Sequence, residues 1–109
     1  MIKAGCIAVA TMPLLRAKEL KQVIDKARVG AALCDIRLGE EMQLAQGQCT
    51  DLKQVLWFNG AGPGSIEALL EGKPPGFANV DTAVDDVALI ALFRQCFDAL
   101  RKARNFAAR

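Results

Sequence analysis

The stretch that decides the fold runs Gln54-Val55-Leu56-Trp57-Phe58-Asn59. It is rich in β-branched and aromatic residues, which predicts a strand. An earlier apolar run, residues 6–13, is continuous rather than alternating, as expected for a strand covered on both faces. A shorter apolar run covers residues 31–34. Strands that begin near residues 6, 31 and 54 have the spacing of parallel β-α-β units.

Between these strands the hydrophobic period changes to that of amphipathic helices. Helices are predicted over residues 14–28, with Gly30 as the stop signal, and over residues 37–47. A short helix is expected over residues 66–71, followed by an exposed connection over residues 72–76. The apolar faces of the first two helices consist of Leu20, Val23, Ile24 and Ala27, and of Leu38, Met42 and Ala45.

Residues 85–106 admit two interpretations. Asp85-Asp86 resembles an N-cap and the hydrophobic positions from Leu89 to Ala103 continue at helical spacing, so we favour one helix from about 86 to 105. The alternative is a strand at 87–91 that leads into a shorter helix. We therefore expect a single α/β domain over residues 1–109: a three-layer fold with a short parallel β-sheet of about three strands, flanking helices and a long C-terminal helix.

Composition excludes several classes of function. The chain has 109 residues, of which 52% are hydrophobic and 24% charged, so one folded domain is expected. It contains no His, which excludes every mechanism that needs an imidazole from this chain. Its four cysteines form no C-x-x-C pair and no signal peptide precedes them, so we expect reduced thiols in the cytoplasm. No apolar run approaches the ~20 residues of a membrane span.

The net charge and its distribution along the chain indicate which classes of binding partner to expect. A net charge of +2 is too close to neutral to indicate a nucleic-acid partner. Residues 94–109 carry five Lys or Arg against one Asp, and we favour a solvated basic helix end over a phosphate or membrane site. The apolar stripe between Leu89 and Phe106 is expected to pack within the monomer or, as the second choice, to form a homodimer through the C-terminal helix.

Three short motifs contain residue types that can bind phosphate or metal ions. Gly60-Ala61-Gly62-Pro63-Gly64 follows a strand and precedes a helix, but it departs from G-x-G-x-x-G and Pro63 lacks an amide donor, so a plain turn is favoured. Gly72-Lys73 is followed by Pro74, where a P-loop needs Ser or Thr. Asp85-Asp86 has no partner acids, so no metal site is expected.

The candidate ligand-binding residues are Thr11, Asp35 and Asn59, each at the carboxyl end of a predicted strand. Open α/β sheets bind ligands at that edge. The alternative is that these side chains only solvate strand ends and cap loops. No catalytic residue and no metal ligand is identified, because the chain offers no convincing nucleophile–base pair.

Residues 3–90 resemble part of the large N-terminal domain of AMP-forming acyl-CoA synthetases, in particular the benzoate–CoA and 2-aminobenzoate–CoA ligases. The resemblance is carried by Lys3-Ala4-Gly5-Cys6-Ile7-Ala8-Val9-Ala10-Thr11-Met12-Pro13-Leu14-Leu15 with Arg16-Ala17-Lys18-Glu19-Leu20, by Ala31 to Asp35, and by Asp85-Asp86-Val87-Ala88-Leu89-Ile90-Ala91. It implies a scaffold of parallel strands with their helices. For the full-length family it implies ATP, Mg²⁺ and CoA as cofactors and an aromatic acid as substrate.

The resemblance stops after Ala91. There the family has a Thr-Ser-Gly-Thr-Thr-Gly-x-Pro-Lys type loop around the ATP phosphates, whereas this chain reads Leu92-Phe93-Arg94-Gln95-Cys96-Phe97. No catalytic residue of the family maps onto a position here. We therefore expect a truncated piece of an aryl/acyl-CoA ligase that is inactive alone and binds no cofactor. The alternative is a small non-enzymatic binding or oligomerisation module.

Overall fold

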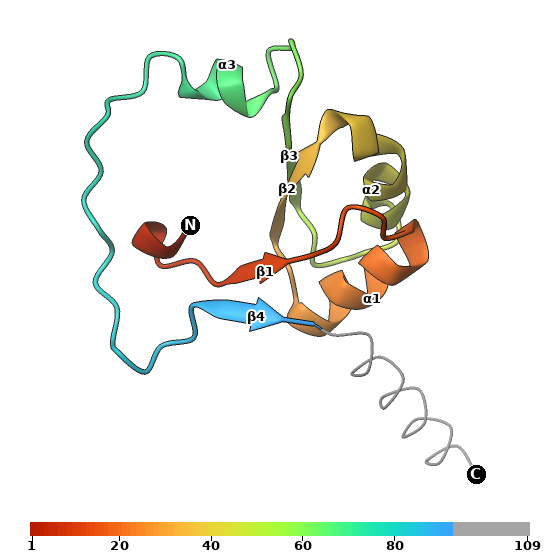
Figure 1. Cartoon of the computed structure of the whole chain (residues 1–109), viewed down its shortest axis with the longest axis horizontal. Coiled ribbons are helices and arrows are strands. Elements are labelled where there is room, and N and C mark those ends of the chain that lie inside the picture. Colours follow the sequence, from red (N-terminus) through yellow and green to blue (C-terminus); the bar gives the residue numbers. More distant parts are fainter. Residues whose placement is uncertain (93–109) are drawn as a thin grey trace.

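The computed structural model describes residues 1–92 of the chain (Figure 1). Helices and strands alternate along most of this length, which confirms the α/β class. The elements are η1 (Ile2–Ala4), β1 (Ala8–Ala10), α1 (Ala17–Ala27), β2 (Ala31–Asp35), η2 (Ile36–Leu38), α2 (Gly39–Gln46), β3 (Gln54–Phe58), α3 (Ile66–Leu70) and β4 (Leu89–Ala91).

The strands form two separate parallel pairs. β2 pairs with β3, with Ala31 opposite Gln54 and Asp35 opposite Phe58. β1 pairs with β4, with Ala8 opposite Leu89. The prediction of one sheet of about three strands is therefore wrong, although the parallel direction is confirmed. Spacing along the chain predicts that strands run parallel, but it does not determine which strands become neighbours.

The predicted helix from residue 86 is also wrong over its first turns, where Leu89–Ala91 forms β4. The apolar run suits a strand because β1 offers it a pairing edge, and the Ala8 amide donates to the Ala88 carbonyl at 2.9 Å. Asp86 does not cap a helix; its carboxylate accepts the Ala83 amide at 2.8 Å and closes a turn. The remainder of the predicted helix, and with it the homodimer contact, lies outside the described residues.

The helix α1 begins and ends through local hydrogen bonds. The Arg16 amide donates to the Glu19 carboxylate at 3.1 Å at the start of the helix. At the other end Arg28 adopts a left-handed conformation with φ 52°, and the Val29 amide donates to the Ile24 carbonyl at 3.0 Å. The helix therefore ends at Ala27, three residues before Gly30, and Val29 packs against the core.

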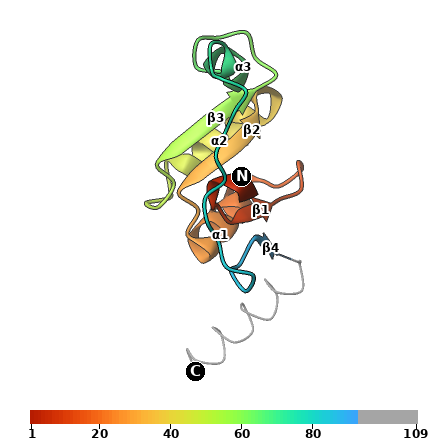
Figure 2. The same cartoon turned by 90° about the vertical axis from the view of Figure 1, so that its left-hand side faces the viewer.

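The core lies between the helices α1 and α2 and one face of the β2–β3 pair. Its buried members are Leu20, Ile24, Cys34, Met42, Ala45 and Leu52. Both helices lie on the same side of these strands (Figures 1 and 2). The helices α1 and α2 thus form one layer against the β2–β3 pair, and the expected second helix layer is not seen in residues 1–92.

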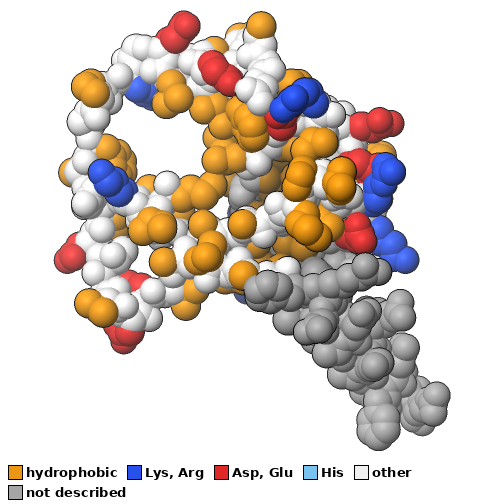
Figure 3. All heavy atoms as spheres, viewed as in Figure 1, with side chains coloured by type: hydrophobic (Ala, Val, Ile, Leu, Met, Phe, Trp, Pro, Cys, Tyr) orange, Lys and Arg blue, Asp and Glu red, His pale blue; other side chains and the backbone are white. Residues whose placement is uncertain are grey.

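Residues 71–88 form a long connection without helix or strand. The predicted exposure of residues 72–76 is confirmed. One tether is the Val80 amide, which donates to the Lys3 carbonyl at 2.8 Å. Figure 3 shows an opening framed by this connection, and hydrophobic side chains around it. No helix of residues 1–92 has the length and apolar character needed to cross a membrane.

Leu20→Ala is expected to lower the free energy of unfolding by about 2–5 kcal/mol, because it leaves a cavity in the core. Leu20 is 7% exposed, whereas Leu44 on α2 is 54% exposed. Leu44→Ala is therefore the matched control and should cost less than about 1 kcal/mol. Urea unfolding followed by the fluorescence of Trp57, the single tryptophan, measures both variants. Equal losses for the two variants would contradict the placement of the core.

Candidate functional site

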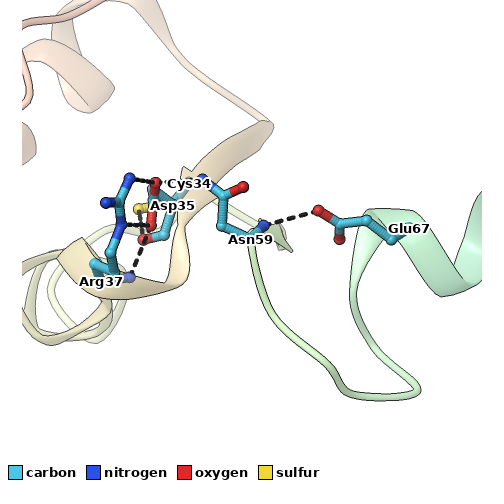
Figure 4. A network of polar contacts seen from close by, with 5 residues as sticks. All are labelled: Cys34, Asp35, Arg37, Asn59 and Glu67. Carbon is cyan, nitrogen blue, oxygen red and sulfur yellow. Dashed lines mark hydrogen bonds and ion pairs between the residues drawn. The ribbon is translucent and has the colours of Figure 1, made fainter.

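The Asp35 carboxylate, at the carboxyl end of β2, is held by four hydrogen bonds (Figure 4). Its Oδ1 accepts the Arg37 amide at 2.9 Å and the Arg37 Nε at 3.0 Å. Its Oδ2 accepts the Arg37 Nη2 at 2.6 Å and the Asn59 Nδ2 at 2.7 Å. Asp35 is only 8% exposed, so these donors replace the water that the carboxylate loses.

The hydrogen bonds from the Arg37 side chain, followed by those from the Arg37 amide and from Asn59, hold the pKa of Asp35 far below its usual range. The same ion pair raises the pKa of Arg37. Asp35 is therefore an ionised anchor over the whole physiological range of pH. It cannot act as a general base, because a carboxylate with so low a pKa has little tendency to take a proton.

Asn59 connects the site to the third helix. It adopts a left-handed conformation with φ 58°, which Asn tolerates better than most residues. Its side chain donates to Asp35, while its backbone amide donates to the Glu67 carboxylate at 2.8 Å. Hydrogen bonds from the Glu67 and Asn59 amides lower the pKa of Glu67. The helix α3 also has the predicted cap, since Ser65 Oγ accepts the Ala68 amide at 3.3 Å.

A pocket of about 710 Å³ lies beside this network, at the carboxyl ends of β1 and β2. Thr11 and Asp35 both line it, whereas Asn59 reaches it only through its bond to Asp35. The structure thus brings Thr11 and Asp35 to one pocket, and ligand binding by the three residues stays a prediction. The rest of the lining consists of Met12, Pro13, Leu15, Arg16, Leu20, Leu33, Cys34, Arg37, Leu38, Glu40, Glu41, Met42 and Phe58.

Three charged residues that line this pocket are not among the predicted site residues: Arg37, Arg16 and Glu41. The Asp35-x-Arg37 spacing is a signal that was available, because an Asp at a helix start commonly accepts the amide two residues on. Glu41 offered no such signal, since its partners lie 24 and 25 residues away: it accepts the Ala17 amide at 2.7 Å and Arg16 Nη1 at 3.0 Å. The hydrogen bond from the Ala17 amide, then that from Arg16, lowers the pKa of Glu41.

The remaining motifs play local roles in the described part of the chain. Residues 60–64 form a turn in which the Gly62 carbonyl accepts the Ser65 amide at 3.0 Å. Within residues 1–92 no three His, Cys, Asp or Glu side chains come together as a metal site. Cys6, Cys34 and Cys49 are free thiols, and burial raises the pKa of Cys34, which makes it a poor nucleophile. Cys96 lies outside the described residues.

Comparison of the chain with protein-family models, curated proteins and solved structures finds no match.

Asp35→Asn is expected to destabilise the protein at neutral pH, and this effect should become smaller in acid. Because the folded-state pKa is depressed, the ionised carboxylate stabilises the fold above the unfolded-state value of about 3.9, and the benefit falls as pH drops below it. Urea unfolding of both proteins between neutral pH and about pH 2.5 measures the difference.

Asp81→Asn is the control, since Asp81 is exposed and makes no hydrogen bond or ion pair to residues 1–92. It should leave stability nearly unchanged at every pH. A constant difference between wild type and Asp35→Asn down to the lowest pH would contradict the ionised anchor.

Proposed function

We propose that this chain is a small non-enzymatic α/β binding module whose strand-end pocket takes a small organic carboxylate. The observation that carries the proposal is a single pocket that combines an apolar lining with the fixed guanidinium of Arg37. Its volume of about 710 Å³ lies in the ~300–1,000 Å³ range of small-molecule sites. Because the described cysteines are free thiols, we place this module in the cytoplasm.

The apolar lining suits the hydrocarbon part of such a ligand. Leu33 comes from β2, Met42 from α2, Phe58 from β3, and Met12 and Leu15 from the segment after β1. Leu33 is 45% and Met12 68% exposed, so a ligand would remove apolar surface of the protein from water. Burial of such surface contributes roughly 25 cal/mol per Å², and it is the main source of affinity in this proposal.

Arg37 is the group that we assign to the carboxylate of the ligand. Its Nε and Nη2 donate to Asp35, which holds the guanidinium in place, while Nη1 makes no hydrogen bond to residues 1–92. The side chain is 77% exposed. Since a guanidinium carries five donors in a fixed fork, its second edge can bind another carboxylate. In this role Asp35 positions Arg37 and does not touch the ligand.

The test compares naphthoate with its neutral analogue naphthamide by NMR titration of the full chain. Naphthoate should bind saturably with a dissociation constant on the order of 1 mM, and naphthamide should bind several-fold more weakly. Leu33→Glu should weaken naphthoate binding at least about tenfold, because it adds a like charge inside the lining.

Leu69→Glu is the matched control, since Leu69 has the same 45% exposure but lies on α3, outside the pocket. It should leave binding unchanged. Equal dissociation constants for naphthoate and naphthamide would contradict the assignment of Arg37 to the carboxylate of the ligand. No saturable signal up to roughly 10 mM naphthoate would refute the pocket as a site for carboxylates.

The sequence resemblance supports a second proposal: the chain is a piece of an AMP-forming aryl/acyl-CoA ligase scaffold that does not activate acids by itself. In that family adenylation needs Mg²⁺ and positioned donors that stabilise the departing pyrophosphate. Leu92-Phe93-Arg94-Gln95 stands where the family has its phosphate loop, and the chain has no His to substitute for lost groups. ATP, Mg²⁺ and CoA then belong to the full-length family and not to this chain.

Pyrophosphate release from ATP, Mg²⁺ and benzoate or 2-aminobenzoate tests this second proposal. We expect release at the rate of the protein-free control, with and without CoA. Release that depends on both protein and acid would overturn the claim of inactivity, and it would leave the binding test above unaffected.

A further inference from the structure

One wall of the pocket is a strap, defined here as residues 11–16, between the end of β1 and the start of α1. Five of its six residues line the pocket: Thr11, Met12, Pro13, Leu15 and Arg16. The strap contains no helix or strand, and only Leu15 among its residues is not exposed. Because the strap buries little of its own surface, its position depends on the hydrogen bonds at its end.

The strap is tied to the opposite wall by Glu41, in the first turn of α2. Glu41 Oε1 accepts Arg16 Nη1 at 3.0 Å, and Oε2 accepts the Ala17 amide at 2.7 Å. The bond to Ala17 is partly buried, and the Glu41 side chain is 31% exposed. Charge-assisted bonds of this kind are roughly twice as strong as neutral ones. The carboxylate thus joins the start of α1 to the first turn of α2 beside the pocket.

We propose that Glu41 is a latch that holds the strap against α2, so that release of its bonds to Arg16 and Ala17 widens the pocket. A regulatory role for this latch rests on the proposed binding function. The contacts of Glu41 with Arg16 and Ala17, in contrast, do not depend on a ligand. Leu15 packs against the core and would remain as a hinge point when the latch opens. The neighbouring Glu40 lines the same pocket and makes no hydrogen bond or ion pair within residues 1–92.

Cys34 reports movement of this wall. It lines the pocket, belongs to the core against which Leu15 and Ala17 pack, and is only 7% exposed, so a maleimide reaches its thiol when the strap and the start of α1 move away. Cys49 is partly exposed, packs against the same core and does not line the pocket. Its labelling rate therefore serves as an internal measure of general loosening of the fold.

The experiment follows N-ethylmaleimide labelling of each cysteine in the full chain by mass spectrometry. Glu41→Ala should raise the rate at Cys34 about tenfold relative to Cys49, and Glu41→Gln should raise it less, because Gln retains an oxygen that accepts the Ala17 amide. Glu40→Ala is the control for loss of an acidic side chain at the rim and should leave the rate unchanged.

A rate at Cys34 equal to wild type in Glu41→Ala would overturn the latch. An equal rise at Cys34 and Cys49 would also overturn it, since the carboxylate would then support the whole fold rather than one wall. Labelling needs no ligand, so failure of naphthoate to bind would refute the proposed function and leave the latch to be judged by these rates.

Discussion

The site depends on the hydrogen bonds that the carboxylate of Asp35 accepts. This carboxylate joins the end of β2 to the turn that leads into α2 through Arg37, and it joins β2 to the end of β3 through Asn59. Asn59 in turn is joined to α3, because its backbone amide donates to the carboxylate of Glu67. One nearly buried charge thus fixes the relative positions of two strands and two helices, which is the reason that it needs so many donors.

The separation of the strands into two pairs creates the pocket. If β1 paired with β2, the two backbones would lie about 4.8 Å apart and would leave no room between them. Instead β1 pairs with β4, and the residues after β1 pass over the carboxyl end of β2. Glu41 holds this crossing segment to α2. The pocket therefore follows from the choice of strand partners, and its lining mixes core side chains such as Met42 with exposed ones such as Met12.

Local patterns predicted much of the fold. The helical face of Leu20, Val23 and Ile24 is buried in α1 as expected, because a 3.6-residue period leaves a helix only one way to bury its apolar side. The apolar run that contains Leu89 does not by itself predict whether it forms a strand or a helix, since such a run suits a buried strand or a buried helix equally. Of the site, Asp35 and Asn59 were predictable as strand-end polar residues. Glu41 was not, because its partners come from another helix.

By itself the sequence determined the α/β class, the positions of α1, α2 and β3, and the exclusion of imidazole chemistry. These properties depend on residue type and on contacts within a few positions along the chain. Only the tertiary structure decided that β1 joins β4, that Asp35 binds Asn59 and that Glu41 reaches Arg16. Such contacts link residues far apart in the chain, and their free energy depends on geometry in three dimensions that no local pattern encodes.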